Sequence, residues 1–328
     1  VEDDSMVKKQ TPEILHTQRK KVQASKEMRR FERAVPFMLM ALPALIYFLV
    51  NNYIPMAGLT VAFKNVNYVD GIWKSPWCGL RNFDFLLKNP NLKQMVVNTL
   101  GYNAIFLTTG TILSVLVAVF LNELCDKFLP KFYQTAFIMP YLLSWTVVSY
   151  MLYAFLNPSY GLLNKLLENV LHVDGISWYT QPKYWRIILP ILNIWKTVGY
   201  TSVIYLASIV GIDESYYEAA TLDGASRWQR IWYVTLPSIL PTIVTMFILS
   251  IGKICYADFG LFYQTTMGSG MLTEATNVID VFVYKALLES GDVGNAAAAG
   301  FLQSVFGCIL VVGSNLVVRK IDKEQALF

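Results

Sequence analysis

Long runs of apolar residues alternate with polar segments along this chain of 328 residues. A helix needs about 20 mostly apolar residues to cross the hydrocarbon core of a bilayer. Several of the runs exceed that length, which predicts helices that are tilted or kinked. We predict an all-α membrane protein with one transmembrane domain at 34–318 and about six spanning helices, at 35–54, 95–121, 132–156, 185–210, 234–256 and 296–318.

Composition supports a membrane protein. The chain is 55% hydrophobic and 15% charged, with a mean hydropathy of +0.42, whereas soluble domains carry about 25% charged residues. The first apolar run follows 33 mostly polar residues, too late for the usual layout of a signal peptide. Residues 1–33 are basic and lack periodicity, and we predict disorder up to about Lys26. We find no internal repeat and no second soluble domain.

The chain contains little of the chemistry that metal, redox or nucleic-acid sites require. Its four cysteines form no CxxC pair, and its two histidines are too few for most histidine-based metal sites. Basic and aromatic residues form no pattern typical of nucleic-acid binding. We therefore predict no catalytic residue, no metal, no cofactor held by this chain and no nucleic-acid partner.

Lysine and arginine are distributed unevenly among the polar segments. If the N-terminus is cytoplasmic, 16 of them lie in the inside segments 1–33, 122–131, 211–230 and 319–328. Eight lie in the longer outside segments 55–94, 157–184 and 257–295. The positive-inside rule therefore predicts both termini in the cytoplasm. The outside segments are rich in aromatic and turn residues, which predicts compact caps and not linkers.

A polar stretch rich in small residues separates the fourth and fifth apolar runs, and the charge rule places it in the cytoplasm. Either Asp213 or Ser215 fits the cap position at the start of a helix, and Ser215 with Glu218 matches the spacing of a capping box. Gly224 would interrupt this helix because glycine adopts backbone angles that side chains disfavour. The helix face that ends at Gly224 is small at its centre, so another surface can approach it closely.

A second short helix is predicted at about 225–233, after which Leu236 and Pro237 begin the fifth span. The cytoplasmic segment 213–230 thus reads as two short helices joined at a glycine. This shape suits insertion into a groove on a partner protein. An amphipathic connection that lies on lipid headgroups fits the same pattern. Physical reasoning from the residues leaves these two interpretations equal.

The motif in this segment resembles a known signature. Glu218-Ala219-Ala220, then Gly224, then Leu236-Pro237 resembles the EAA motif of permease subunits of ATP-binding-cassette (ABC) importers, with Val234 where many members have isoleucine. The likeness extends over about 31–318. Stretches that resemble permeases for oligosaccharides or polysaccharide fragments are Tyr53-Ile54-Pro55-Met56, Ile72-Trp73-Lys74-Ser75-Pro76-Trp77-Cys78-Gly79-Leu80-Arg81-Asn82-Phe83 and Ile194-Trp195-Lys196-Thr197-Val198-Gly199.

The resemblance implies the type I importer permease (MetI-like) fold in a bacterial cell membrane, with alternating access driven from outside this chain. Its implied partners are a second homologous permease, two ATPase subunits that bind ATP and Mg, an extracellular sugar-binding lipoprotein and membrane lipid. The chain has no GxxxxGK[ST] pattern, so it is not itself the ATPase. The resemblance implies these ATPase-coupling residues: Tyr217, Glu218, Ala219, Ala220, Asp223, Gly224, Arg227, Leu236 and Pro237.

Sugar sites combine hydroxyl-binding polar groups with aromatic faces. Residues of these kinds within the predicted spans make Trp145, Asn193, Trp195 and Tyr256 our candidates for the substrate path. Packing in the aromatic belt of a membrane protein is the competing interpretation for each aromatic residue. Lys196 and Lys253 would face a cavity or partner, snorkel to a membrane face, or pair with a carboxylate such as Asp258.

Three classes of function compete. An importer permease for oligosaccharides accounts for the motif, and a permease for another solute shares it. A multi-spanning enzyme acting on glycans would need a cluster of acidic or histidine side chains at a membrane edge. Asp213, Glu214, Glu218 and Asp223 form such a cluster without the spacing of a metal site. A stand-alone secondary transporter often shows internal repeats, and none is visible.

Overall fold

The computed structural model describes residues 34–67, 69–124, 129–172 and 174–321. The chain divides into two compact units, Val1–Thr60 and Val61–Phe328. Within the described ranges the chain is helical, and extended backbone pairs only in an isolated bridge between Lys64 and Trp77. The predictions for residues 1–33 and for the end of the tail lie outside the described residues.

The described part of the first unit is one apolar helix, which runs from Ala34 to Phe63 and so ends just beyond the unit's boundary. A wide turn, η1 (Leu49–Tyr53), leads into α2 (Ile54–Met56), and η2 (Ala57–Phe63) forms the last part. The N–H of Ile54 donates to the carbonyl of Leu49, five residues back. Pro55 follows directly, and its ring would clash with a carbonyl in a regular helix. The wide turn therefore lets the helix continue through this proline.

Counted over the described ranges, five helices are long and apolar enough to span a membrane. In the second unit these are α5 (Leu92–Glu123), α9 (Pro182–Val210), the continuous helix Arg227–Ile251 and α15 (Val293–Ile321). Each lies where a span was predicted. The predicted fifth span extends beyond the end of this helix, because the helix stops at Ile251 and residues 252–255 form a turn.

The remaining predicted span, 132–156, is not one straight helix. It consists of α6 (Leu129–Leu142) and α7 (Trp145–Leu156), and the two are bent by 94° at the break. Pro140 lies in the last turn of α6, where it supplies no N–H. Ser144 then caps α7 by accepting a hydrogen bond from the N–H of Val147 at 3.3 Å. The proline and the new cap together start a second helix in a different direction.

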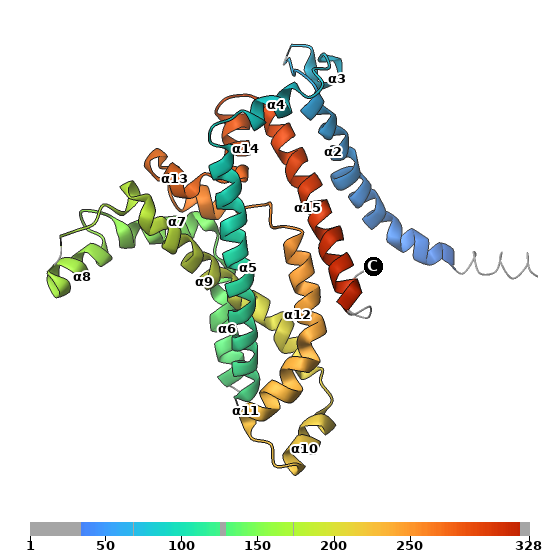
Figure 1. The fold of residues 1–328 in the computed structure, drawn as a ribbon, viewed down its shortest axis with the longest axis vertical. Helices are drawn as coiled ribbons and strands as arrows, with labels where there is room; N and C mark the ends of the chain where they lie inside the picture. Colours follow the sequence, from blue (N-terminus) through green and yellow to red (C-terminus); the bar gives the residue numbers. More distant parts are fainter. Residues whose placement is uncertain (1–33, 68, 125–128, 173, 322–328) are drawn as a thin grey trace, which may run out of the picture. The chain divides into compact units, whose positions relative to one another are not determined.

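Helices α5 and α9 pack against each other extensively (Figure 1). A buried cluster joins both to the long helix that follows; its members are Val115, Ala118, Tyr205, Ile209 and Ile239. Helix α6 also packs against α9, and Gly199 there lies directly against the backbone of Phe137. A Cβ at Gly199 would overlap the Phe137 carbonyl, so glycine is required for this close approach.

The connections predicted to be compact caps are folded into short helices. These are α3 (Gly71–Lys74), α4 (Arg81–Leu87), α8 (Leu162–Leu171), η3 (Trp178–Thr180), η5 (Gly260–Gln264), η6 (Gly270–Leu272), α13 (Thr273–Thr276) and α14 (Ile279–Leu288). Asn164 is buried, and both the nitrogen and the oxygen of its side-chain amide form hydrogen bonds within the cap at 157–184. Its Nδ2 donates to the carbonyls of Pro158 and Ile176, and its Oδ1 accepts from the Trp178 indole at 2.8 Å.

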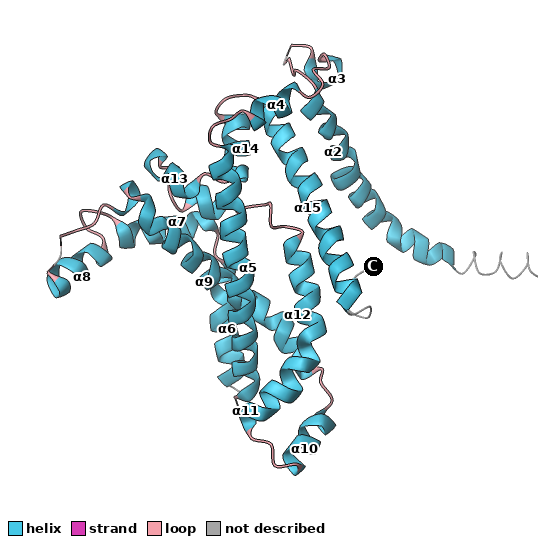
Figure 2. Ribbon diagram, in the orientation of Figure 1, coloured by secondary structure: helices cyan, strands magenta, loops and turns pink. Residues whose placement is uncertain are grey.

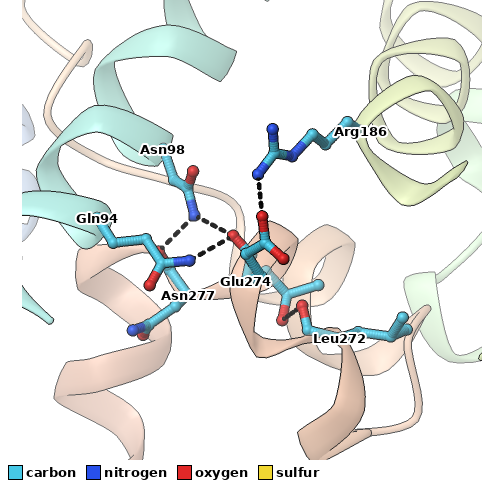
Figure 3. A network of polar contacts seen from close by, with 7 residues as sticks. Gln94, Asn98, Arg186, Leu272, Glu274 and Asn277 are labelled. Atoms are coloured by element: carbon cyan, nitrogen blue, oxygen red, sulfur yellow. Dashed lines mark hydrogen bonds and ion pairs between the residues drawn. The ribbon is translucent and has the colours of Figure 1, made fainter. Parts of the chain in front are cut away.

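Polar contacts attach the cap formed by residues 257–295 to the starts of α5 and α9 (Figure 3). Gln94 and Asn98 both donate to the carbonyl of Glu274, at 2.7 and 3.0 Å. Asn98 also donates to the carbonyl of Asn277. The side chain of Glu274 forms an ion pair with Arg186 at 2.5 Å. The asparagine and glutamine on α5 thus satisfy backbone oxygens within the short helix α13 and at its C-cap.

Candidate functional site

Helix α10 (Glu214–Leu222) occupies the segment predicted to dock a partner, at the end of the second unit where α11 also lies (Figure 2). Asp213 is its N-cap, and its carboxylate accepts a hydrogen bond from the N–H of Ser215 at 2.9 Å. This bond holds the pKa of the Asp213 carboxyl below its usual range. Of the two predicted caps, Asp213 is the one observed. The predicted capping box of Ser215 with Glu218 is wrong, because Ser215 already belongs to the first turn of the helix.

The end of α10 is set by Gly224, as predicted. This residue has a φ of +78°, in the left-handed region that favours glycine. The N–H of Gly224 donates to Thr221, and the N–H of Ala225 donates to Ala220, at 3.0 and 2.9 Å. This pair of bonds is a Schellman motif, which satisfies the last carbonyls of the helix. A Cβ at Gly224 would meet nothing within 4 Å, so the space beside it is open.

The segment after Gly224 differs from the prediction of a separate second helix. Helix α11 (Arg227–Arg230) begins at a capping box formed by Ser226 and Gln229. It continues through the wide turn η4 (Ile231–Thr235) into α12 (Leu236–Ile251). Residues Arg227–Ile251 therefore form one helix. The N–H of Leu236 donates to Ile231, five residues back, and this wide turn accommodates Pro237 without a break.

Two side-chain bonds tie α10 to the base of this long helix. The hydroxyls of Tyr217 and Thr235 lie 2.9 Å apart, and Arg230 donates to the hydroxyl of Thr221 at 3.2 Å. Thr235 is buried, so the Tyr217 hydroxyl reaches into the helix packing while its helix remains outside. These two bonds attach α10 to the helix that continues into α12.

The other face of α10 is available to a partner. No residue of α10 is buried within the described chain. Its exposed apolar side chains include Leu222 at 90% and Tyr216 at 63%, and Trp228 on α11 is 73% exposed. Glu218, Ala219 and Asp223 are exposed beside them. Exposed apolar groups gathered on a short helix are typical of a surface that inserts into a groove.

The sequence-predicted coupling residues divide between two elements. On α10 or in the turn after it lie Tyr217, Glu218, Ala219, Ala220, Asp223 and Gly224. On the long helix lie Arg227, Leu236 and Pro237. Leu236 packs against the buried cluster between α5 and α9, and Pro237 is exposed. The structure therefore places the first group at the exposed tip and the last two residues at its connection to the core.

A cavity of about 290 Å³, lined by both polar and apolar groups, lies halfway along α5 and α9. Its lining is Asn103, Phe106, Leu107, Gly110, Thr111, Asn193, Thr197, Thr201, Ser250, Lys253, Ile254, Tyr256 and Asp258. Two of the four candidates for the substrate path, Asn193 and Tyr256, are among these residues. Trp195 is 42% exposed and is not part of the lining. Hydroxyls and amides among apolar groups are what a sugar site requires.

Trp145 stands behind this cavity and does not line it. Its indole N–H donates to the carboxylate of Asp258 at 2.6 Å. Its ring lies directly against Gly260, where a Cβ would overlap the indole. Asp258 also accepts from the backbone N–H groups of Gly260 and Leu261, at 2.9 and 3.4 Å. The tryptophan therefore positions Asp258 and the start of η5.

Lys196 has a role that sequence reasoning missed. This lysine is buried, and its ammonium donates to the carbonyls of Pro140, Tyr141 and Leu143 at the break between α6 and α7. It also lies 5.0 Å from the centre of the Trp145 ring. Carbonyls at a helix end lack partners of their own, and a membrane supplies no water to replace them. The lysine supplies those partners and is too buried to snorkel, and among the described residues it forms no direct ion pair with a carboxylate.

Asn103 and Gln303 hold the turn that follows α12. Asn103 donates to the carbonyls of Ile254 and Tyr256, each at 2.9 Å. Gln303 donates to the carbonyl of Cys255 at the same distance. This turn is irregular backbone at the depth of the cavity, where unpaired carbonyls are unfavourable. The apolar sequence around each amide was the available signal for a buried partner. The partners of Asn103, however, lie 151 and 153 residues away in the sequence.

Comparison with known proteins identifies a family and several relatives with a similar sequence. Residues 110–323 match the family described as "Binding-protein-dependent transport system inner membrane component". Protein LplB of Bacillus subtilis (strain 168) is 32% identical over 286 residues, which cover 87% of this chain and 89% of that protein. The polygalacturonan/rhamnogalacturonan transport system permease protein YteP of the same organism is 33% identical, with coverage of 87% and 88%.

A solved structure is similar over nearly the whole chain. It is the crystal structure of a bacterial ABC transporter involved in the import of the acidic polysaccharide alginate. One of its chains matches with a TM-score of 0.81 and 32% identity, and the match covers 90% of this chain and 99% of that one. A second structure, the alginate transporter in complex with alginate pentasaccharide-bound periplasmic protein, matches with a TM-score of 0.80 and 32% identity over 90% and 98% of the two chains.

Proposed function

Because this chain belongs to the family of binding-protein-dependent transport system inner membrane components, we propose that it is a permease subunit of an ABC importer for oligosaccharides. The relatives that match most of the chain are transport permeases and not enzymes. The observation that carries the proposal is the exposed helix α10, fastened through Tyr217 and Arg230 to a helix that reaches the central cavity. Such a helix suits the coupling of an external motor to a membrane pathway.

In this proposal α10 inserts into a groove of an ATPase subunit on the cytoplasmic side. The excess of lysine and arginine in the segments on this side supports that orientation. The long helix Arg227–Ile251 would transmit the movement, since it begins beside α10 and ends at the turn that lines the cavity. At about 1.5 Å per residue it covers roughly 37 Å. ATP and Mg would be bound by the ATPase subunits.

A second, homologous permease would complete the central cavity, and two ATPase subunits would serve the pair. An extracellular lipoprotein would deliver the sugar to the capped end. The solved complex between the alginate transporter and its periplasmic protein supports this arrangement. The location would be the plasma membrane of a bacterium, where the apolar helices contact lipid. Permeases for polygalacturonan and alginate among the relatives support an oligosaccharide as the substrate.

Assembly with the ATPase tests the proposal. We expect the full-length chain to copurify with an ATPase subunit and a second permease. We expect ATP hydrolysis by the reconstituted complex to rise when the cognate binding protein carries an oligosaccharide. Transport of sugar by this chain alone would favour a secondary transporter, and glycan turnover without ATP would favour a membrane enzyme. Stimulation by a non-sugar solute alone would keep the importer and change its substrate.

The cavity predicts which substitutions impair uptake. We expect Asn193→Ala and Tyr256→Ala to lower the initial rate of oligosaccharide uptake into vesicles by a few-fold to about tenfold, because a lost hydrogen bond is worth about 0.5–1.5 kcal/mol. Trp145→Ala would act indirectly, by releasing Asp258. Trp195→Ala is the matched comparison, since this side chain does not line the cavity. A loss of uptake in Trp195→Ala alone would place the substrate path on another surface.

A further inference from the structure

Among three basic residues in or beside the predicted spans, Lys253 differs from the other two. Arg186 forms an ion pair with Glu274 at 2.5 Å. Lys196 is buried and donates to backbone carbonyls at the helix break. The ammonium of Lys253 has no hydrogen-bond or ion-pair partner among the described residues. An ionisable group within a membrane protein normally has such a partner, because an unpaired charge there is unfavourable.

Lys253 is one of the residues that line the central cavity. Lys253 lines the cavity beside Asn193, Thr197 and Ser250, whose amide and hydroxyl groups are uncharged hydrogen-bonding groups. The cavity lies about halfway along both α5 and α9, so it is remote from the polar segments at either end. A cation surrounded by hydroxyl and amide groups is suited to a ligand that carries both hydroxyls and a negative charge.

Asp258 is the acidic residue in the same lining, and its carboxylate is already engaged. One oxygen accepts the Trp145 indole N–H at 2.6 Å, and the other accepts the backbone N–H of Gly260 at 2.9 Å. These bonds turn the Asp258 carboxylate toward η5 and α7, where the Lys196 ammonium also lies within 5.0 Å of the Trp145 ring. Hydrogen bonds to a carboxylate stabilise its charge locally. The charge of Lys253 is therefore left for a ligand.

We propose that Lys253 forms a carboxylate-binding subsite in the central cavity, so that the imported oligosaccharide contains uronic acid residues. This inference rests on the proposed function as an oligosaccharide importer. With about 290 Å³, the cavity is just below the range of roughly 300–1,000 Å³ for small-molecule sites. It therefore accommodates part of an oligosaccharide, and the ammonium contacts the carboxylates as they pass. A single charged hydrogen bond of this kind is worth about 1.5–3 kcal/mol, or roughly 10- to 150-fold in binding.

The test uses the complete importer in proteoliposomes with its cognate binding protein. The probes are tri- and tetragalacturonate, oligomers of guluronate and mannuronate, and the same oligosaccharides with their carboxyl groups reduced to alcohols. We expect wild-type ATP hydrolysis and uptake to be stimulated by an acidic oligomer. We expect Lys253→Gln to lower this stimulation at least tenfold and Lys253→Arg to retain most of it. Lys183→Gln, at an exposed lysine near the start of α9, is the matched control and should behave as wild type.

Each other outcome overturns a defined part of the argument. If only neutral or carboxyl-reduced oligosaccharides stimulate ATP hydrolysis, the carboxylate subsite is wrong and the importer remains. If Lys253→Gln responds to acidic oligomers as wild type does, Lys253 is not the subsite. If this variant instead loses the second permease during purification while each assembled complex responds normally, Lys253 pairs with that subunit and the proposal fails. If no oligosaccharide of either kind stimulates the complex, the proposed function itself fails.

Discussion

Gly224→Trp is expected to abolish sugar-stimulated ATP hydrolysis by the assembled importer, with at least a tenfold loss, while membrane insertion stays normal. The φ of +78° at this position disfavours any side chain by about 1–2 kcal/mol. A Cβ there meets no atom of this chain within 4 Å, so the chain itself has room for the indole. The bulk would instead occupy the space into which we propose that the ATPase surface fits.

The control for this prediction is Gly71→Trp. Gly71 also has a left-handed φ, of +71°, and open space around its Cβ position, but it lies in the cap that contains α3. Both variants therefore carry the same backbone strain and the same added ring. We expect Gly71→Trp to copurify with the ATPase as wild type does, and Gly224→Trp to lose it. Normal ATPase association and stimulation in Gly224→Trp would contradict a docking role for the end of α10.

Lys196→Met is expected to have the second large effect, on stability. Methionine fills a similar space but donates nothing to the carbonyls of Pro140, Tyr141 and Leu143. Each buried carbonyl left without a donor is unfavourable by about 1–3 kcal/mol. Removing the charge of Lys196 from the membrane is favourable by about 2.5–3.5 kcal/mol on insertion scales. The three lost bonds outweigh that gain, and we expect net destabilisation on the order of 3 kcal/mol.

Thermal unfolding of the purified chain in detergent would measure this loss as a lower midpoint. Lys183→Met is the matched control, because Lys183 lies on the same helix but is exposed and contacts only the ring of Tyr184 among the interactions described for it. We expect its midpoint to stay within about one degree or two of wild type, as is usual for surface substitutions within about 0.5 kcal/mol. A wild-type midpoint for Lys196→Met would show that water or another donor serves the carbonyls at the break.

The break at the end of α6 connects the two largest structural findings. It places Trp145 at the start of α7, where its indole holds Asp258, and it creates the carbonyls that Lys196 satisfies. Gly199 permits α6 to approach α9 closely enough for Lys196 to reach them. Irregular backbone at membrane depth requires such partners because lipid offers none. The bent pair is therefore held by partners of its own behind the cavity, where Trp145 contacts the lining residue Asp258.

Several features could be predicted from local patterns. The apolar runs located five helices long enough to span a membrane, because one run of about 20 apolar residues is sufficient evidence for a span. Gly224 was recognised as a helix end because glycine is favoured where φ is positive. Local patterns did not predict the course of the helix at each proline, because a proline either accompanies a bend or is accommodated by a wide turn. Pro140 precedes a 94° bend, whereas Pro237 lies within a continuous helix behind a wide turn.

The sequence by itself determined where the chain is apolar, where its charges lie and where α10 ends, because these depend on residues within a few positions of one another. Only the tertiary structure decided the roles of Lys196, Asn103 and Trp145. Their partners lie between 53 and 153 residues away in sequence, and packing alone brings them together. The same packing engages Asp258 and leaves Lys253 facing the cavity, so the contrast between these two charges has no counterpart in the linear chain.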